Sequence, residues 1–178
     1  MASRAGGSEP SGSASAILAD AVEGMASEAA RRRVSLVLAP IGTDATLLAD
    51  REWLRQVLES LVDNALRHAG GLTRVTLALA VEPGGAATVT VTDDGPGFPE
   101  TGEALFERFR RESPSGETGF GIGLALARWV VERHDGAIRL GAGPQDRGAQ
   151  VALAFPVSDD ASSAPHRTEK ETTAWPGS

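Results

Sequence analysis

The chain has 178 residues, of which 41% are hydrophobic and 23% are charged, so it is long enough for one globular domain with short tails. Its 17 basic and 24 acidic residues give a net charge of −7, which argues against nucleic acid or an anionic membrane surface as the main partner. The absence of cysteine excludes disulfides, thiolate nucleophiles and zinc–thiolate sites. No apolar run has the length of a transmembrane helix, and the first residues lack the apolar core of a signal peptide, so we expect a cytoplasmic domain without membrane contact.

The two ends of the chain are expected to be flexible tails. Residues 1–13 and 158–178 are rich in Gly, Ser, Pro, Thr and charge, and they carry little apolar surface to offset the entropy lost on ordering. The sequence therefore predicts one ordered domain over residues 14–157.

Apolar residues at helical spacing predict three main helices, over residues 16–32, 51–69 and 122–134. Asp50 is suited to cap the start of the second helix, and Gly70-Gly71 ends it. A shorter helix is expected around residues 105–110.

Alternating or β-branched runs predict five strands, over residues 34–38, 75–81, 88–92, 137–140 and 150–155. The second and third are separated by the turn residues Pro83-Gly84-Gly85, which favours an antiparallel hairpin. Because helices and strands are interspersed with hairpin connections, we expect an α/β two-layer sandwich: a mixed sheet of about five strands with three main helices on one face.

The second helix carries the first candidate site. Ser60, Asn64, and Arg67 or His68 follow one stripe beside its apolar face. An amide there can offer its oxygen to Mg²⁺, and an arginine one turn later can meet a phosphate. Taken alone, the segment is equally a polar helix face.

The second candidate is Asp93-Asp94-Gly95-Pro96-Gly97-Phe98, which directly follows a strand. Its two glycines allow a flat ligand to approach the backbone, and a carboxylate at the strand end can accept a hydrogen bond from an exocyclic amine. Taken alone, these residue types also make an ordinary turn.

The third candidate is a glycine-rich segment that leads into an apolar helix. Glycines at alternate positions leave backbone N–H groups free to point at an anion, and the helix dipole favours negative charge there. The GxGxG spacing differs from the GxGxxG of dinucleotide-binding folds, and the GK[ST] of a P-loop is absent, so a merely flexible segment stays an alternative. Its residues are Gly119, Phe120, Gly121, Ile122, Gly123 and Leu124.

The three candidate motifs follow one another along the chain, and the segment LFERF lies between the second and the third motif. Together they resemble the motifs of the catalytic and ATP-binding (HATPase) domain of bacterial sensor histidine kinases. That domain belongs to the ATPase group shared with gyrase, the Hsp90 chaperones and MutL, and has a Bergerat-type ATP-binding fold. LVDNALRHA resembles the N box of the family, DDGPGF its G1 box, LFERF its F box and GFGIGL its G2 box. The resemblance covers residues 15–157.

The resemblance implies a role for each motif. Asn64 would coordinate Mg²⁺ bound to the ATP phosphates and, with Arg67 near those phosphates, would be catalytic. Asp93 would accept a hydrogen bond from the adenine amino group. The nucleotide-binding residues implied are Asn64, Arg67, His68, Asp93, Gly95, Gly97, Phe98, Phe109, Gly119, Phe120, Gly121, Ile122, Gly123 and Leu124.

The resemblance also places a mobile ATP lid at about residues 110–120, directly after the F-box aromatics Phe106 and Phe109. The resemblance leaves open which of Arg108, Arg110 and Arg111 reaches the γ-phosphate.

Two departures from the family pattern bear on the reaction. Many members carry a second Asn at the position of Ser60, and gyrase-like and anti-sigma-factor relatives carry there a Glu that activates a nucleophile. Ser60 cannot act as that base, and the neighbouring Glu59 points about 100° away around the helix. Hydrolysis and the anti-sigma-factor-type serine kinase are therefore disfavoured alternatives.

None of His68, His134 and His166 lies in the family's phosphoacceptor setting, so each is expected to be structural or incidental. The partners implied are a histidine-containing dimerisation domain of the same parent protein and, after it, a response regulator receiver domain. A nucleotide-binding regulatory module without transfer activity is the remaining alternative.

Overall fold

The computed structural model describes residues 12–158 apart from 69, 83–84 and 99–119. The elements in chain order are α1 (Ala14–Arg31), β1 (Ser35–Leu38), α2 (Arg51–His68), β2 (Arg74–Glu82), β3 (Ala86–Asp93), α4 (Phe120–Arg133), β4 (Ala137–Ala142), the 3₁₀ turn η1 (Pro144–Asp146) and β5 (Ala149–Pro156). The short helix expected around residues 105–110 lies outside the described residues, as do both expected tails except Gly12, Ser13 and Ser158.

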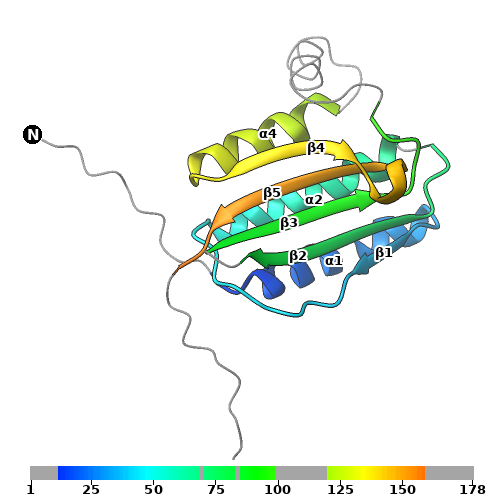
Figure 1. The fold of residues 1–178 in the computed structure, drawn as a ribbon. Helices are drawn as coiled ribbons and strands as arrows, with labels where there is room; N and C mark the ends of the chain where they lie inside the picture. Colours follow the sequence, from blue (N-terminus) through cyan, green and yellow to red (C-terminus); the bar gives the residue numbers. More distant parts are fainter. Residues whose placement is uncertain (1–11, 69, 83–84, 99–119, 159–178) are drawn as a thin grey trace, which may run out of the picture.

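The five strands form one mixed sheet with the order β1-β2-β3-β5-β4. β1 pairs with β2 in parallel, and the other three pairings are antiparallel, including the expected β2–β3 hairpin. The three helices lie against one face of this sheet (Figure 1), so the predicted two-layer sandwich is confirmed.

The core lies between the helices and the inner face of the sheet. Leu79, Val89, Leu153 and Ile138 stand in register across four strands, with Val89 and Leu153 fully buried. α2 supplies the opposing buried stripe, which consists of Leu54, Val57, Leu58, Leu61, Val62 and Leu66. The period-2 pattern of the strands and the 3.6-residue period of α2 thus meet in one apolar layer.

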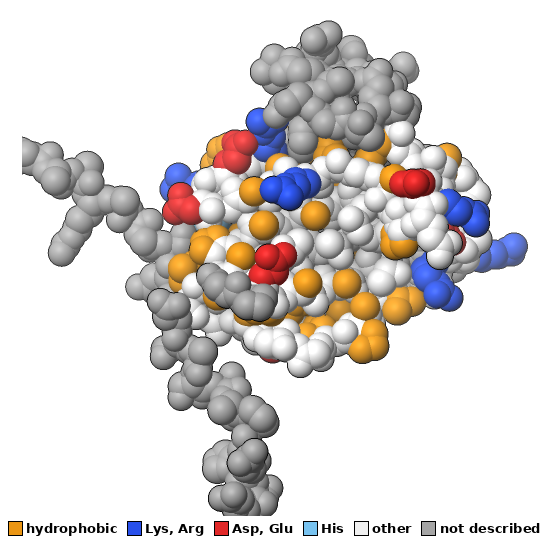
Figure 2. Space-filling view, viewed as in Figure 1, with side chains coloured by type: hydrophobic (Ala, Val, Ile, Leu, Met, Phe, Trp, Pro, Cys, Tyr) orange, Lys and Arg blue, Asp and Glu red, His pale blue; other side chains and the backbone are white. Residues whose placement is uncertain are grey.

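The other face of the sheet is built from small and hydroxylated side chains. Because strand residues alternate between faces, this face carries the residues that lie between the inward ones along each strand: Thr76, Ala78, Thr88, Thr90, Ala152 and Ala154. A space-filling view from this side shows few charged side chains over the middle of the sheet (Figure 2).

The ends of α2 and α4 are joined by hydrogen bonds. The Oδ1 atom of Asp50 accepts from the N–H groups of Glu52 and Trp53 at 2.9 and 3.1 Å, which confirms Asp50 as the N-cap of α2. The backbone N–H of Asp50 donates to Nε2 of His134 at 3.2 Å, so Nδ1 of that ring carries the proton and donates to the Val130 carbonyl at 2.7 Å. His134 therefore has the structural role expected of it.

Two details differ from the sequence prediction. α4 begins at Phe120, two residues earlier than expected, so Gly121 lies within its first turn instead of before it. The turn η1 between β4 and β5 was not anticipated, because Gln145 and Asp146 adopt positive φ angles of 61° and 57° that few non-glycine residues adopt.

Gly148 closes this turn in a conformation that only glycine tolerates. Its φ is +71°, and a Cβ atom there would overlap the backbone carbonyl oxygen of Asp93. We therefore expect Gly148→Ala to lower the free energy of unfolding by about 3 kcal/mol, because left-handed strain adds to a backbone clash. Urea denaturation at pH 7 measures this change.

Gly141→Ala in β4 is the matched control, since nothing lies within 4 Å of the added Cβ and its φ is not positive. We expect it to change the free energy of unfolding by less than about 1 kcal/mol. Equal stability of the two variants would show that the β4–β5 turn can move away from β3.

Candidate functional site

Asp93, the last residue of β3, is held by two backbone N–H groups that share one of its oxygens. Oδ1 accepts from Gly95 at 2.9 Å and from Ala149 at 3.2 Å. Oδ2 has no hydrogen-bond partner among the described residues. Burial raises the pKa of the Asp93 carboxyl, although the two N–H donors partly oppose the shift. The side chain thus presents one partly desolvated acceptor atom to a ligand.

The neighbouring Asp94 has a different role. It is exposed and accepts from the N–H and the hydroxyl of Thr73 and from the N–H of Arg74. Desolvation alone would raise the pKa of Asp94, but these hydrogen bonds lower it below its ordinary value. Asp94 therefore fastens the start of β2 to the end of β3.

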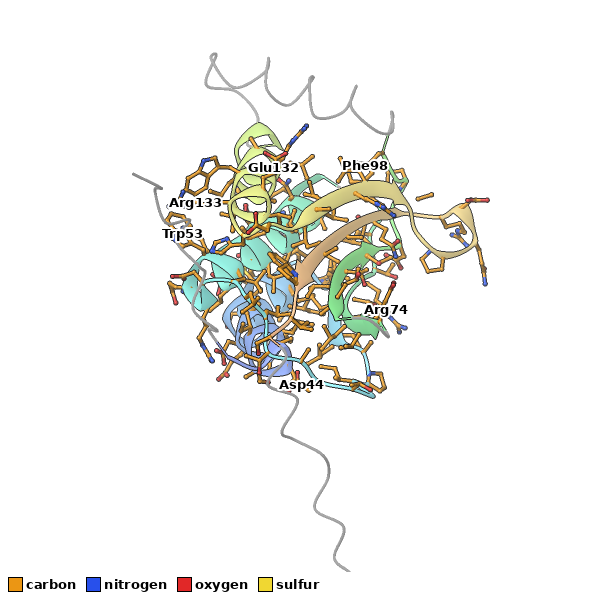
Figure 3. The ribbon with its side chains drawn as sticks, turned by 60° about the vertical axis from the view of Figure 1, so that its left-hand side comes forward. Asp44, Trp53, Arg74, Phe98, Glu132 and Arg133 are labelled. Atoms are coloured by element: carbon orange, nitrogen blue, oxygen red, sulfur yellow. The ribbon has the colours of Figure 1, made fainter. Side chains whose placement is uncertain are left out.

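The loop between β4 and β5 packs directly on the Gly95–Phe98 segment. A Cβ on Gly97 would lie 2.9 Å from the carbonyl oxygen of Gly148, so the two backbones touch. Phe98 packs against the edge of the core (Figure 3). Sequence reasoning missed Gly148 and Ala149; a glycine directly before a strand was the available signal.

Asn64 lies on α2 where the first turn of α4 crosses it. A Cβ on Gly123 would be 2.5 Å from Oγ of Ser60 and 3.4 Å from Nδ2 of Asn64, so any side chain at position 123 would require Ser60 to move. The first N–H groups of α4, from Phe120 to Gly123, have no partner within their own helix and carry its positive dipole end. Asn64 and these donors together form a site suited to an anion with a bound cation.

Arg67, one turn after Asn64, is engaged with another side chain. Its Nε lies 2.7 Å from Oδ2 of Asp63, and the two side chains are 56% and 35% exposed. This hydrogen bond raises the pKa of Arg67 above its ordinary value. Exposed pairs of this kind contribute little to stability, so a phosphate can compete for the guanidinium.

Glu59 faces away from Ser60, as its position on the helix predicted. It pairs with Arg55, and its Oε1 lies beside Gly24 of α1, whereas Ser60 faces α4. No carboxylate therefore stands at the position of Ser60.

The structure gathers the predicted residues into two groups. Ser60, Asn64 and Gly123 form one, and Asp93, Gly95 and Gly97 form the other; no hydrogen bond between described residues joins Asn64 to Asp93. Leu124 is buried in the core behind the first turn of α4. The described part of the chain does not include Phe109, Gly119, the F box, the expected lid, or the side chains of His68, Phe120 and Ile122.

The comparisons with known proteins agree with this geometry. Residues 49–159 match the family described as histidine kinase-, DNA gyrase B- and HSP90-like ATPases. The chain belongs to this family. Its similarity to the histidine kinases follows from relatives such as the adaptive-response sensory kinase SasA of Crocosphaera subtropica. The two sequences are 37% identical over 111 residues, and the match covers 61% of this chain and 29% of SasA.

Solved structures lead to the same group of ATPases. The mycobacterial sensor histidine kinase MprB is 27% identical with a TM-score of 0.60, covering 79% of this chain and 94% of that one. Full-length ShkA, solved in complex with AMPPNP, is 28% identical with a TM-score of 0.65, covering 80% of this chain and 30% of that one. The chain is thus an ATP-binding domain of the sensor histidine kinase type, and it covers less than a third of the length of the curated relative SasA. Among the described helices, none is long and apolar enough to span a membrane.

The opposite pKa shifts of Asp93 and Asp94 predict opposite effects on stability. Because the pKa of Asp93 is raised in the folded state, its contribution is favourable below the ordinary Asp value of 3.8 and is lost as the pH rises through the folded value. The pKa of Asp94 is lowered, so its contribution is present above 3.8 and is lost as the pH falls through the folded value. At pH 7 we expect Asp93→Asn to be at least as stable as the wild type.

Asp94→Asn, in contrast, should be less stable at pH 7 by about 1 kcal/mol or less, since the carboxylate is exposed. Both differences should shrink on acidification, that of Asp93→Asn first. Urea denaturation of the two variants between pH 7 and pH 3 measures this; a loss of stability in Asp93→Asn at pH 7 would contradict the burial argument.

Proposed function

We propose that this domain binds ATP with Mg²⁺ and supplies the γ-phosphoryl group to a histidine on a separate dimerisation domain of the same parent protein, for relay to the receiver domain of a response regulator. The observation that supports the proposal is the close approach of Asn64 to Gly123 in the first turn of α4. It brings a side chain suited to bind a cation near backbone N–H groups that have no partner within their own helix. Membership of the ATPase family supports the same conclusion.

The adenine end of the proposed site is Asp93. Its Oδ2, which has no partner among the described residues, suits the exocyclic amine of adenine, because a half-buried oxygen without a donor gains most from a hydrogen bond. Guanine would present a carbonyl oxygen at the equivalent ring position and would be repelled. Gly95 and Gly97 leave room for the flat base against the backbone.

The described residues around Asn64 can bind Mg²⁺ only together with phosphate oxygens, because they do not supply enough ligands by themselves. No group of three or more His, Asp or Glu side chains in the described part of the chain forms a metal cage. The oxygen of the Asn64 amide is a suitable hard ligand, and phosphate oxygens would supply others, as is usual for Mg²⁺. When bound, the ion would neutralise charge on the triphosphate. The α4 N–H groups and Arg67 would hold the oxygens of the phosphates.

The position of Glu59 supports transfer to another domain over hydrolysis or serine phosphorylation. Both of those alternatives need a base beside the phosphates, and Glu59 is paired with Arg55 on the side of α1. An acceptor histidine can bring its own base. Phe109, the lid, and the remaining G2 residues Gly119, Phe120, Gly121 and Ile122 are proposed as nucleotide contacts on the resemblance alone.

Calorimetric titration of ATP with and without Mg²⁺ tests the proposal. Asn64→Ala should lose the Mg²⁺-dependent part of the affinity, because it removes a ligand oxygen. Asp93→Asn should weaken binding about 10-fold or more whether or not Mg²⁺ is present, because an amide N–H₂ would face the adenine amine. Glu59→Gln, on the same helix as Asn64 but facing α1, is the matched control and should bind as the wild type does.

Phosphotransfer to a supplied histidine domain distinguishes the kinase from a regulatory module. Labelling that disappears in Asn64→Ala supports the kinase. ATP binding without labelling would favour the regulatory module, and a folded wild type that binds no ATP would overturn both.

The Asp63–Arg67 pair gives a separate test of the phosphate contact. Asp63→Asn should release Arg67 and raise ATP affinity by up to about 5-fold, the equivalent of an exposed ion pair, while Arg67→Ala should lower it. Arg31→Ala breaks a comparable exposed pair with Glu28 on α1 and should have no effect. Unchanged affinity in both Asp63→Asn and Arg67→Ala would remove Arg67 from the proposed site.

A further inference from the structure

Two tryptophans from different helices form an exposed aromatic patch. Trp53 of α2 is 42% exposed and Trp129 of α4 is 53% exposed, and among the described residues they are the only large hydrophobic side chains classed as exposed. Their rings meet edge to face with centroids 5.9 Å apart, and the Arg133 guanidinium lies 6.0 Å from the centre of the Trp129 ring. Figure 3 shows Trp53 and Arg133 on the same side of the molecule. We call Trp53, Trp129 and Arg133 the tryptophan patch.

The patch is separate from the proposed nucleotide site. Trp53 lies in the first turn of α2, and Asn64 follows eleven residues later, about 16 Å along the helix. Neither ring is needed to fill the core, whose buried side chains come from other positions. The proposed function therefore leaves the patch without a role.

The size of the patch argues against a second copy as its occupant. A tryptophan can bury roughly 150–250 Å², so two half-exposed rings offer on the order of 200 Å². A stable interface needs about 800 Å² on each partner. A segment of the same chain does not lose translational freedom on docking, and its effective concentration is of millimolar order, so it can use a contact of this size.

The C-terminal segment 159–178 starts close enough to reach the patch. The N–H of Ser158 donates to the carbonyl of Thr46 at 3.0 Å, and Thr46 precedes Trp53 by only seven residues, at most about 25 Å of chain. Trp175 follows Ser158 by seventeen residues, which extend to at most about 60 Å. The segment therefore spans the distance with length to spare.

The segment also carries chemistry that matches the patch. It holds Trp175, the third of the three tryptophans of the chain, whereas residues 1–13 hold no aromatic residue. Glu171 precedes Trp175 by four residues, and Arg133 has no carboxylate partner among the described residues. Aromatic stacking and a carboxylate for the cation would be satisfied together.

We propose that the C-terminal segment docks on the tryptophan patch, with the Trp175 ring packed against Trp53 and Trp129 and the Glu171 carboxylate paired with Arg133. This contact ties the end of the chain to α2 and α4 on the side away from the nucleotide site. It needs no ATP, so its failure would leave the proposed function untouched.

The three indole Nε1–H signals in a ¹H–¹⁵N spectrum of the full chain report on this contact. We expect Trp175→Ala to shift the signals of both Trp53 and Trp129, and to do so equally in dilute and concentrated samples. Thr173→Ala, in the same segment, is the matched control and should leave both signals in place. Glu171→Gln should move them part of the way, because the aromatic contact remains.

Two results would overturn the proposal. If the Trp53 and Trp129 signals are the same in the wild type and in Trp175→Ala, the segment does not dock. If they move with protein concentration in the wild type, a second copy covers the patch instead. Folding does not confuse the test, because the remaining signals of the domain serve as an internal check.

Discussion

The proposed phosphate site depends on how closely α4 approaches α2. Glycine at position 123 allows this approach, because a Cβ there would lie 2.5 Å from Oγ of Ser60 and would force that side chain to move. This approach keeps the first N–H groups of α4, which have no partner within their own helix, beside Asn64. At its other end α4 is held by the Asp50–His134 hydrogen bond, so the helix is fixed to α2 at both ends. A larger side chain at Gly123 would disturb both sides of the anion site.

The adenine end is built on a different principle. There the position of one carboxylate oxygen is determined by two backbone N–H groups, and one of them comes from Ala149 at the start of β5, 56 residues further along the chain. Gly148 allows the turn before β5 to touch β3. Because both N–H groups donate to the same oxygen, the other oxygen has no partner among the described residues. α2 connects the two ends, since it packs against both β3 and α4.

Local signals in the sequence predicted most of the fold. The periodicity of Leu54, Val57, Leu58 and Leu61 sets the buried face of α2, and the cap at Asp50 marks its start. Contacts between distant segments were not predictable in the same way. Gly148 approaches β3, and Trp53 contacts Trp129, only because of tertiary packing. Local sequence patterns do not predict such contacts. The i,i+4 spacing of Asp63 and Arg67 is enough to predict their ion pair, whereas the family motif predicts only a phosphate contact for Arg67.

The lengths of the strands bear on how the domain behaves beside copies of itself. The two strands at the edges of the sheet, β1 and β4, have four and six residues, while the three interior strands have eight or nine. Pro40 follows closely after β1 and Pro144 after β4, and Arg139 places a charge on the edge strand β4. Short edges with proline and charge nearby offer few free backbone groups to a neighbouring chain. Two copies of the domain that came close together would thus be protected against joining edge to edge into a continuous sheet.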